Sequence, residues 1–95
     1  MSDNLHVDGI RFSPASADAR EHGLLGFVSF KLGDTLIVDG IQLRKTATGS
    51  LALKFPERHD RDGQRHPLIR PLDQAARDSI TAIVVEPLRA KGLIP

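Results

Sequence analysis

The sequence contains no cysteine, tryptophan or tyrosine. Without cysteine, the chain has no disulfide framework, no thiolate nucleophile and no cysteine-ligated zinc site. Its aromatic side chains are four phenylalanines, at positions 12, 27, 30 and 55. A nucleic-acid surface built mainly on base stacking would be hard to assemble from so few rings.

The sequence also lacks the segments that direct a protein to a membrane. The opening stretch MSDNLHVDGIRFSP has neither the basic start nor the apolar core of a secretory signal, and no apolar run is long enough to span a bilayer. The net charge is +1 over 95 residues, with 40% hydrophobic and 26% charged residues, as in ordinary globular proteins. We therefore expect one soluble, cytoplasmic domain over residues 1–95 with no membrane partner.

Short apolar segments separated by turn residues predict an antiparallel sheet of about five strands. Asp39-Gly40 changes the alternation of its segment, which predicts a bulge or bend, and the small polar residues of 13–23 predict a mobile loop. The strands are expected at residues 5–12, 24–32, 35–45, 51–55 and 66–71.

The last part of the chain has the pattern of a helix. Asp73 is a good N-cap, and Ala76, Ile80, Ile83 and Val84 then form one apolar stripe at helical spacing. Pro87 is expected to end or kink this helix, which leaves 88–95 as a tail. The predicted fold class is therefore α+β, an antiparallel meander with one C-terminal helix packed on one face.

The segment 24–32 is apolar on both of its faces. Val28 and Phe30 point one way, whereas Leu25 and Phe27 point the other. Because one helix covers only one face of a sheet, the second apolar face predicts an interface. A homodimer that buries Leu25 and Phe27, or one that pairs strand edges, would satisfy this requirement.

The stretch LKFPERHDRDGQRHPLIRPLD, residues 53–73, concentrates charge between apolar segments. Arginine pairs readily with phosphate and stays charged at cellular pH, so this bridge is a candidate anion-binding loop, with His59 as a further cation when protonated. The competing interpretation is a solvated hairpin tip that needs no ligand. Residues 54–70 hold five cations, Lys54, Arg58, Arg61, Arg65 and Arg70, against three acids, Glu57, Asp60 and Asp62.

Other chemistries fit the same stretch poorly. Asp60-Arg-Asp-Gly63 imitates the start of a calcium loop, but Ile69, Arg70 and Pro71 stand where later oxygen ligands belong. His59 and His66 could flank zinc with Asp60 or Asp62, yet turn chemistry and surface histidines explain them more simply.

Ser29, Ser50 and Ser79 are scattered and lie in no nucleophile motif. We expect no metal, no cofactor, no small-molecule substrate and no catalysis.

The order of these segments resembles the SpoVG family, the septation and stage V sporulation G proteins. The resemblance covers about residues 5–86 and is carried by HVDGIRF, GFVSFKLGDTLIVDGIQLRK, GSLALKFPERHDRDGQRHPLIRPLD and the helix that follows. The matching positions are Asp39, Ile41, Gly49, Leu51, Pro56, Asp62, Gly63, Leu68, Pro71, Leu72 and Asp73.

The resemblance implies a small homodimeric bacterial regulator that binds DNA and also RNA through the basic loop after the proline-ended strand. Arg58 and His59 match the family's basic pair, and Arg61 and Arg65 are additions of this sequence; the acids of the bridge dilute its charge. Roles in septation, cell division and sporulation are implied in the same way. The alternative from another class is a protein-interaction module that docks a partner on an apolar sheet face or edge.

Overall fold

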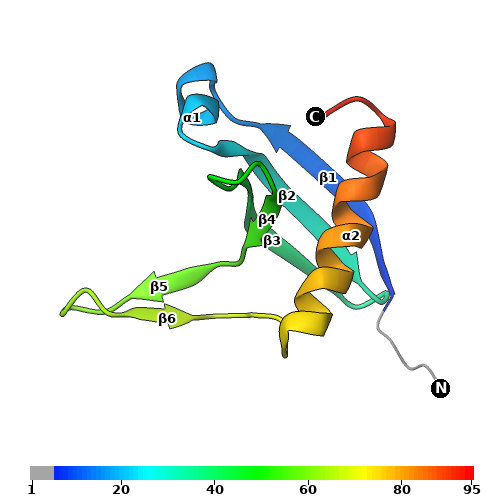
Figure 1. Ribbon diagram of the computed structural model, residues 1–95. Coiled ribbons are helices and arrows are strands. Elements are labelled where there is room, and N and C mark those ends of the chain that lie inside the picture. Colours follow the sequence, from blue (N-terminus) through cyan, green and yellow to red (C-terminus); the bar gives the residue numbers. More distant parts are fainter. Residues whose placement is uncertain (1–5) are drawn as a thin grey trace.

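The computed structural model describes residues 6–95 and has the α+β architecture predicted from the sequence (Figure 1). A four-stranded antiparallel sheet has the order β1–β2–β3–β4, and α2 (Gln74–Ala90) lies across one of its faces. The charged bridge forms a separate two-stranded ribbon instead of a fifth strand of the main sheet. The strands are β1 (Val7–Pro14), β2 (Leu24–Leu32), β3 (Leu36–Lys45), β4 (Leu51–Lys54), β5 (Glu57–His59) and β6 (Arg65–Pro67).

The predicted irregularity at Asp39-Gly40 is confirmed as a bulge in β3. Val28 pairs with Ile41 and Phe30 with Val38, so two residues of β3 lie opposite one residue of β2. Gly40 adopts a φ of +72°, which side chains with a Cβ rarely take. The extra residue lets Val38 and Ile41 both face the core although they are three positions apart.

The core lies between the sheet and α2. Fully buried side chains of β2 and β3 meet Val84 and Leu88 of the helix, and Leu53 of β4 closes one side. Gly26 is required here, because a Cβ at this position would collide with the Phe12 ring and the Ser13 carbonyl oxygen. The buried apolar residues are Val28, Phe30, Val38, Ile41, Leu43, Leu53, Val84, Val85, Leu88 and Ile94.

The prediction of a loop over 13–23 is wrong in its central part. Residues 13 and 14 still belong to β1, and the short helix α1 (Ala17–Glu21) follows. Ser16 caps this helix, since its Oγ accepts a hydrogen bond from the Ala19 amide at 3.1 Å. The serine followed by alanines and acids is a helix-start signal that the loop interpretation overlooked.

The prediction that the helix ends near Pro87 is also wrong. The helix α2 continues through this proline to Ala90, and Gly92 follows it. Leu88 is 3% exposed and Ile94 is 8% exposed, so the segment expected to be a tail contributes two side chains to the core. Burial of these two side chains offsets the backbone hydrogen bond that proline cannot donate.

Within residues 6–95, no helix has both the length and the apolar character needed to cross a membrane.

This placement of the C-terminal segment can be tested with one buried and one exposed leucine of the segment. We predict that Leu88→Ala lowers the free energy of unfolding by roughly 2–5 kcal/mol, because it leaves a cavity in the core. The matched variant Leu93→Ala should cost about 0.5 kcal/mol or less, since Leu93 is 50% exposed. Urea unfolding followed by circular dichroism measures both values. Equal small effects would show that residues 88–95 do not contribute to the core.

Candidate functional site

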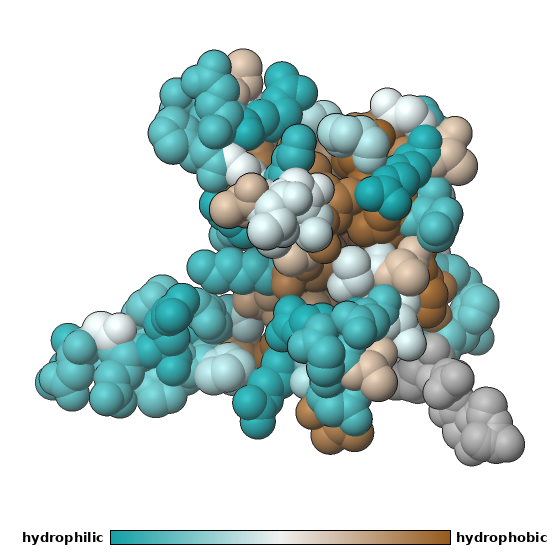
Figure 2. Space-filling view, in the orientation of Figure 1, coloured by the Kyte–Doolittle hydropathy of each residue, from teal (hydrophilic) through white to brown (hydrophobic). Residues whose placement is uncertain are grey.

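The ribbon β5–β6 projects from the body of the molecule (Figure 1). None of its residues is buried, and Glu57, Arg58 and His59 pair with Pro67, His66 and Arg65. At its base, the Leu68 amide donates to the Pro56 carbonyl at 3.1 Å. The sequence therefore places its most charged segment on an arm that solvent surrounds, and Figure 2 shows this arm covered by hydrophilic residues.

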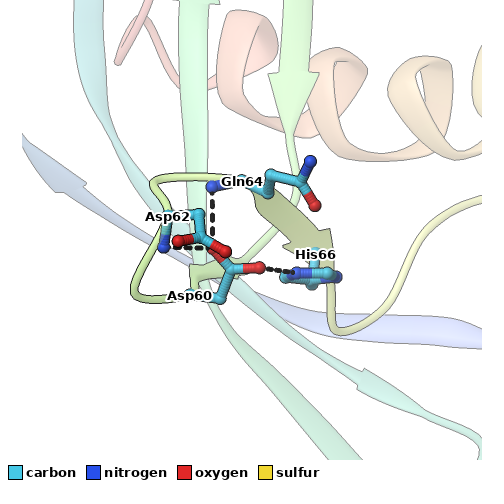
Figure 3. A network of polar contacts seen from close by, with 4 residues as sticks. All are labelled: Asp60, Asp62, Gln64 and His66. Atoms are coloured by element: carbon cyan, nitrogen blue, oxygen red, sulfur yellow. Dashed lines mark hydrogen bonds and ion pairs between the residues drawn. The ribbon is translucent and has the colours of Figure 1, made fainter.

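The carboxylate of Asp60 organises the turn at the tip of this arm (Figure 3). Its Oδ1 accepts hydrogen bonds from the amides of Asp62 and Gln64, both at 2.9 Å, and its Oδ2 accepts one from Nε2 of His66 at 2.8 Å. The Gly63 amide donates to the Asp60 carbonyl at 3.0 Å. One acid thus holds the turn and joins it to β6.

These hydrogen bonds lower the pKa of Asp60 below its ordinary value of 3.8, and the contact with His66 is the largest cause. A carboxyl whose pKa is lower in the folded state adds stability that is present above its unfolded value and disappears as pH falls through its folded value. The Asp60 anchor is therefore intact at neutral pH and is lost only in acid.

The three arginines predicted to grip an anion do not form one cluster. Side chains alternate across a ribbon, so Arg58 shares a face with Asp60 and His66, whereas Arg65 shares the opposite face with Glu57. Nη1 of Arg65 lies 3.6 Å from Oε1 of Glu57. Arg58 and Arg61 are exposed, and neither pairs with a carboxylate of residues 6–95. These two arginines are therefore the cations of the arm that are available to a ligand.

The remaining predicted contacts lie apart from one another. His59 is exposed beside Arg65 on the ribbon. Lys54 is the last residue of β4, on the main sheet, and Arg70 borders a hollow at the start of α2. The cations predicted to contact an anion are therefore spread over the arm, the end of β4 before it and the segment that follows it.

An apolar hollow lies between the sheet, the first turns of α2 and residues 69–72, which join the arm to this helix. Its volume is about 640 Å³, and Figure 2 shows apolar surface gathered around α2 and the sheet. Leu72 at its rim is 91% exposed, and Leu68, just before the lining segment, is 64% exposed. The strand predicted over residues 66–71 gave no sign of this hollow; the observed strand β6 ends at Pro67 and leaves Leu68, Ile69 and Leu72 outside any strand. The apolar lining includes Phe30, Phe55, Ile69, Leu72, Ile80 and Ile83.

The two residues predicted for the dimer interface have different environments. Leu25 is partly buried and packs against the core, contrary to its expected orientation, because the pairing of β2 with β3 shifts between Leu24 and Gly26. Phe27 is 43% exposed on the sheet face opposite α2. The apolar surface expected around this pair is therefore Phe27, with Ile37, which is 65% exposed and pairs with Lys31, farther along the same face.

Within residues 6–95, no three side chains of histidine, aspartate or glutamate gather where they could hold a metal ion. Asp60 and His66, two of the residues considered for zinc, instead bind each other in the turn.

A scan of the chain against protein-family models gives no match, and a search of curated proteins gives none either.

The anchoring role of Asp60 makes a local prediction. Asp60→Ala removes the acceptor of the Asp62 and Gln64 amides, so hydrogen exchange of both amides should become roughly fivefold faster or more. Amides of β2 and β3 should keep their protection, because the arm adds nothing to the core. The measurement is hydrogen exchange followed by NMR at pH 7.

The matched control is Asp62→Ala, because the Asp62 side chain accepts no hydrogen bond from residues 6–95. This variant should exchange like the parent. If Asp60→Ala and Asp62→Ala behave alike, the turn does not depend on the Asp60 carboxylate.

Proposed function

We propose that the protein is a non-enzymatic regulator that binds DNA or RNA as a homodimer, with the arm at residues 57–66 contacting phosphates. The observation that carries this proposal is the exposure of Arg58 and Arg61 on a projecting arm, with no carboxylate paired to either within residues 6–95. The resemblance to SpoVG supports it, since it maps the family's basic pair onto Arg58 and His59. A cytoplasmic, bacterial role in septation or sporulation follows from the same resemblance.

The acids of the arm limit its non-specific attraction for polyanions. Three arginines face three acids between residues 57 and 66, so the arm is formally neutral when its histidines are neutral. Asp60 and Glu57 are engaged within the arm, which leaves Arg58 and Arg61 as directed contacts. Binding through such contacts is weak for one arm, and a dimer strengthens it by presenting two.

The homodimer interface that we propose uses the apolar hollow and not the Leu25–Phe27 face. Leu68 and Leu72 project beside a hollow that is lined by similar apolar side chains. A two-fold axis brings the same patch of both chains together, so the projecting leucines of one chain can enter the hollow of the other. This contact buries exposed apolar surface and places two arms in one assembly.

The second candidate function is a protein-interaction module, and the same hollow is the observation that favours it. A different protein with apolar side chains could fill the hollow in place of a second copy. Salt dependence separates the two functions, since binding to phosphates weakens steeply as salt rises whereas apolar docking does not.

The arginines of the arm provide the direct test. We predict that Arg58→Ala/Arg61→Ala weakens binding to all sequences by about tenfold or more at low salt and reduces the salt slope. Arg65→Ala should have a smaller effect, because Glu57 already pairs with Arg65. Fluorescence anisotropy with labelled duplex DNA, single-stranded DNA and RNA at two salt concentrations measures these effects.

Arg20→Ala on α1 is the matched control, because it removes one exposed cation far along the chain from the arm. If the double variant and this control both bind as the parent does, the arm is not the phosphate contact. Arg77, Arg89 and Lys91 of the helix side then become the next candidates.

The interface gives a second prediction. Light scattering at micromolar concentration should give the parent twice the mass of the 10.4 kDa chain. Leu68→Asp combined with Leu72→Asp should give a single chain that is still folded, because both side chains are exposed. Phe27→Asp should remain a dimer. A monomeric parent would refute the dimer, and dissociation by Phe27→Asp alone would place the interface on the other face.

A further inference from the structure

The face of the main sheet that α2 leaves uncovered carries a row of side chains that crosses all four strands. Ser13 pairs with Phe27, Phe27 with Gln42, and Gln42 with Lys54. Directly paired residues point to the same face, so these four side chains form one line about 14 Å long. None of them is buried, and Phe27 is an exposed aromatic ring near the middle of the line.

Positive charge surrounds this ring on both sides of the row. Arg11 lies two residues before Ser13, and Arg44 lies two residues after Gln42, so each is a diagonal neighbour of Phe27 at about 7–8 Å. Lys54 ends the row. Acids lie at the far end of the face, where Asp8 contacts Lys31 and His6, and at Asp39 in the bulge. The positions of β1 and β3 that are paired with Phe27 or diagonal to it therefore hold two cations and no acid.

Arg44 is held in place without being neutralised. Its Nη1 donates to Oε1 of Gln42 at 3.0 Å, and its Nη2 donates to the carbonyl of His22 at 3.2 Å. Both acceptors are neutral, so the guanidinium keeps its full charge in a fixed position. The same contact orients the Gln42 amide beside the ring, with its N–H groups available to a base edge.

We propose that this face binds single-stranded nucleic acid, with one unpaired base stacked on Phe27 and the flanking phosphates at Arg11, Arg44 and Lys54. The inference rests on the nucleic-acid function proposed above and adds the kind of nucleic acid. An aromatic ring on an open sheet can stack only on a base that is free of its own helix, whereas duplex bases are already stacked and paired. The arm then contributes phosphate contacts to a strand that the sheet face selects.

The location of the dimer interface is consistent with this use of the sheet. The apolar hollow lies on the α2 side, so association through it leaves the row from Ser13 to Lys54 open in both chains. The exposed Phe27 thus has a role other than the apolar contact expected for it from the sequence.

Three substitutions of Phe27 test the proposal. We expect Phe27→Leu, which keeps apolar volume but removes the ring, to weaken binding of a labelled single strand of about 12 nucleotides roughly tenfold. Phe27→Ala should weaken it at least as much, and Phe27→Tyr should bind like the parent. The salt slope should stay unchanged in all three, because no charge is removed. Thermal unfolding checks that each variant is folded.

The charges around the ring provide an independent measurement. Arg11→Ala/Lys54→Ala should lower the salt slope for the single strand by about 0.7 for each phosphate that the variant no longer neutralises. If the arm contacts the phosphates as proposed above, Arg89→Ala/Lys91→Ala, at the C-terminal end of α2, leaves the slope unchanged and is the matched control. Parallel titrations use oligouridylate, oligothymidylate and a duplex of the same length.

Each outcome separates this inference from the function on which it rests. If the parent binds and Phe27→Leu binds equally well, or if the parent prefers the duplex, the sheet proposal is overturned while the nucleic-acid function stands. If the parent binds none of the three probes, both fail. Loss of single-strand affinity in Phe27→Leu with recovery in Phe27→Tyr supports a stacked base.

Discussion

The burial of one sheet face beneath α2 is the constraint on which the rest of the structure depends. The helix supplies Val84, Val85 and Leu88 to a core whose other half comes from β2, β3 and β4. This burial keeps the helix continuous through Pro87 and draws Ile94 onto the same core. It also fixes the register of β3, because the bulge at Gly40 is needed to turn both Val38 and Ile41 toward the helix.

A single helix leaves three surfaces of different character. On the α2 side, an apolar hollow lies between the helix, the sheet and residues 69–72. The opposite sheet face is polar and basic around one aromatic ring, and the arm exposes arginines on a ribbon that has no core of its own. Under the function proposed above, association with a second chain and contact with a nucleic acid would therefore use different residues.

The sequence was sufficient for features that depend on local chemistry. Alternating segments predicted the strands of the main sheet, Asp73 predicted the start of α2, and Asp39-Gly40 predicted the bulge. It was insufficient for features that depend on packing between segments distant in the chain. The continuation of α2 depends on burial of Leu88 and Ile94, and the inward position of Leu25 depends on a shift of strand pairing. Arg58 and Arg65 lie on opposite faces of the ribbon because of the way β5 pairs with β6, and the amino-acid composition of the bridge does not specify that pairing.

The edges of the main sheet have a consequence for the solubility of the folded chain. An exposed strand edge can template the growth of aggregates by pairing with further chains. Here β1 carries a pairing irregularity between Asp8 and Arg11 and ends at Pro14, while β4 has four residues and is followed closely by Pro56. Neither edge offers a long, regular row of free backbone groups. Both edges of a sheet with so apolar a core therefore resist the backbone pairing by which fibrils grow.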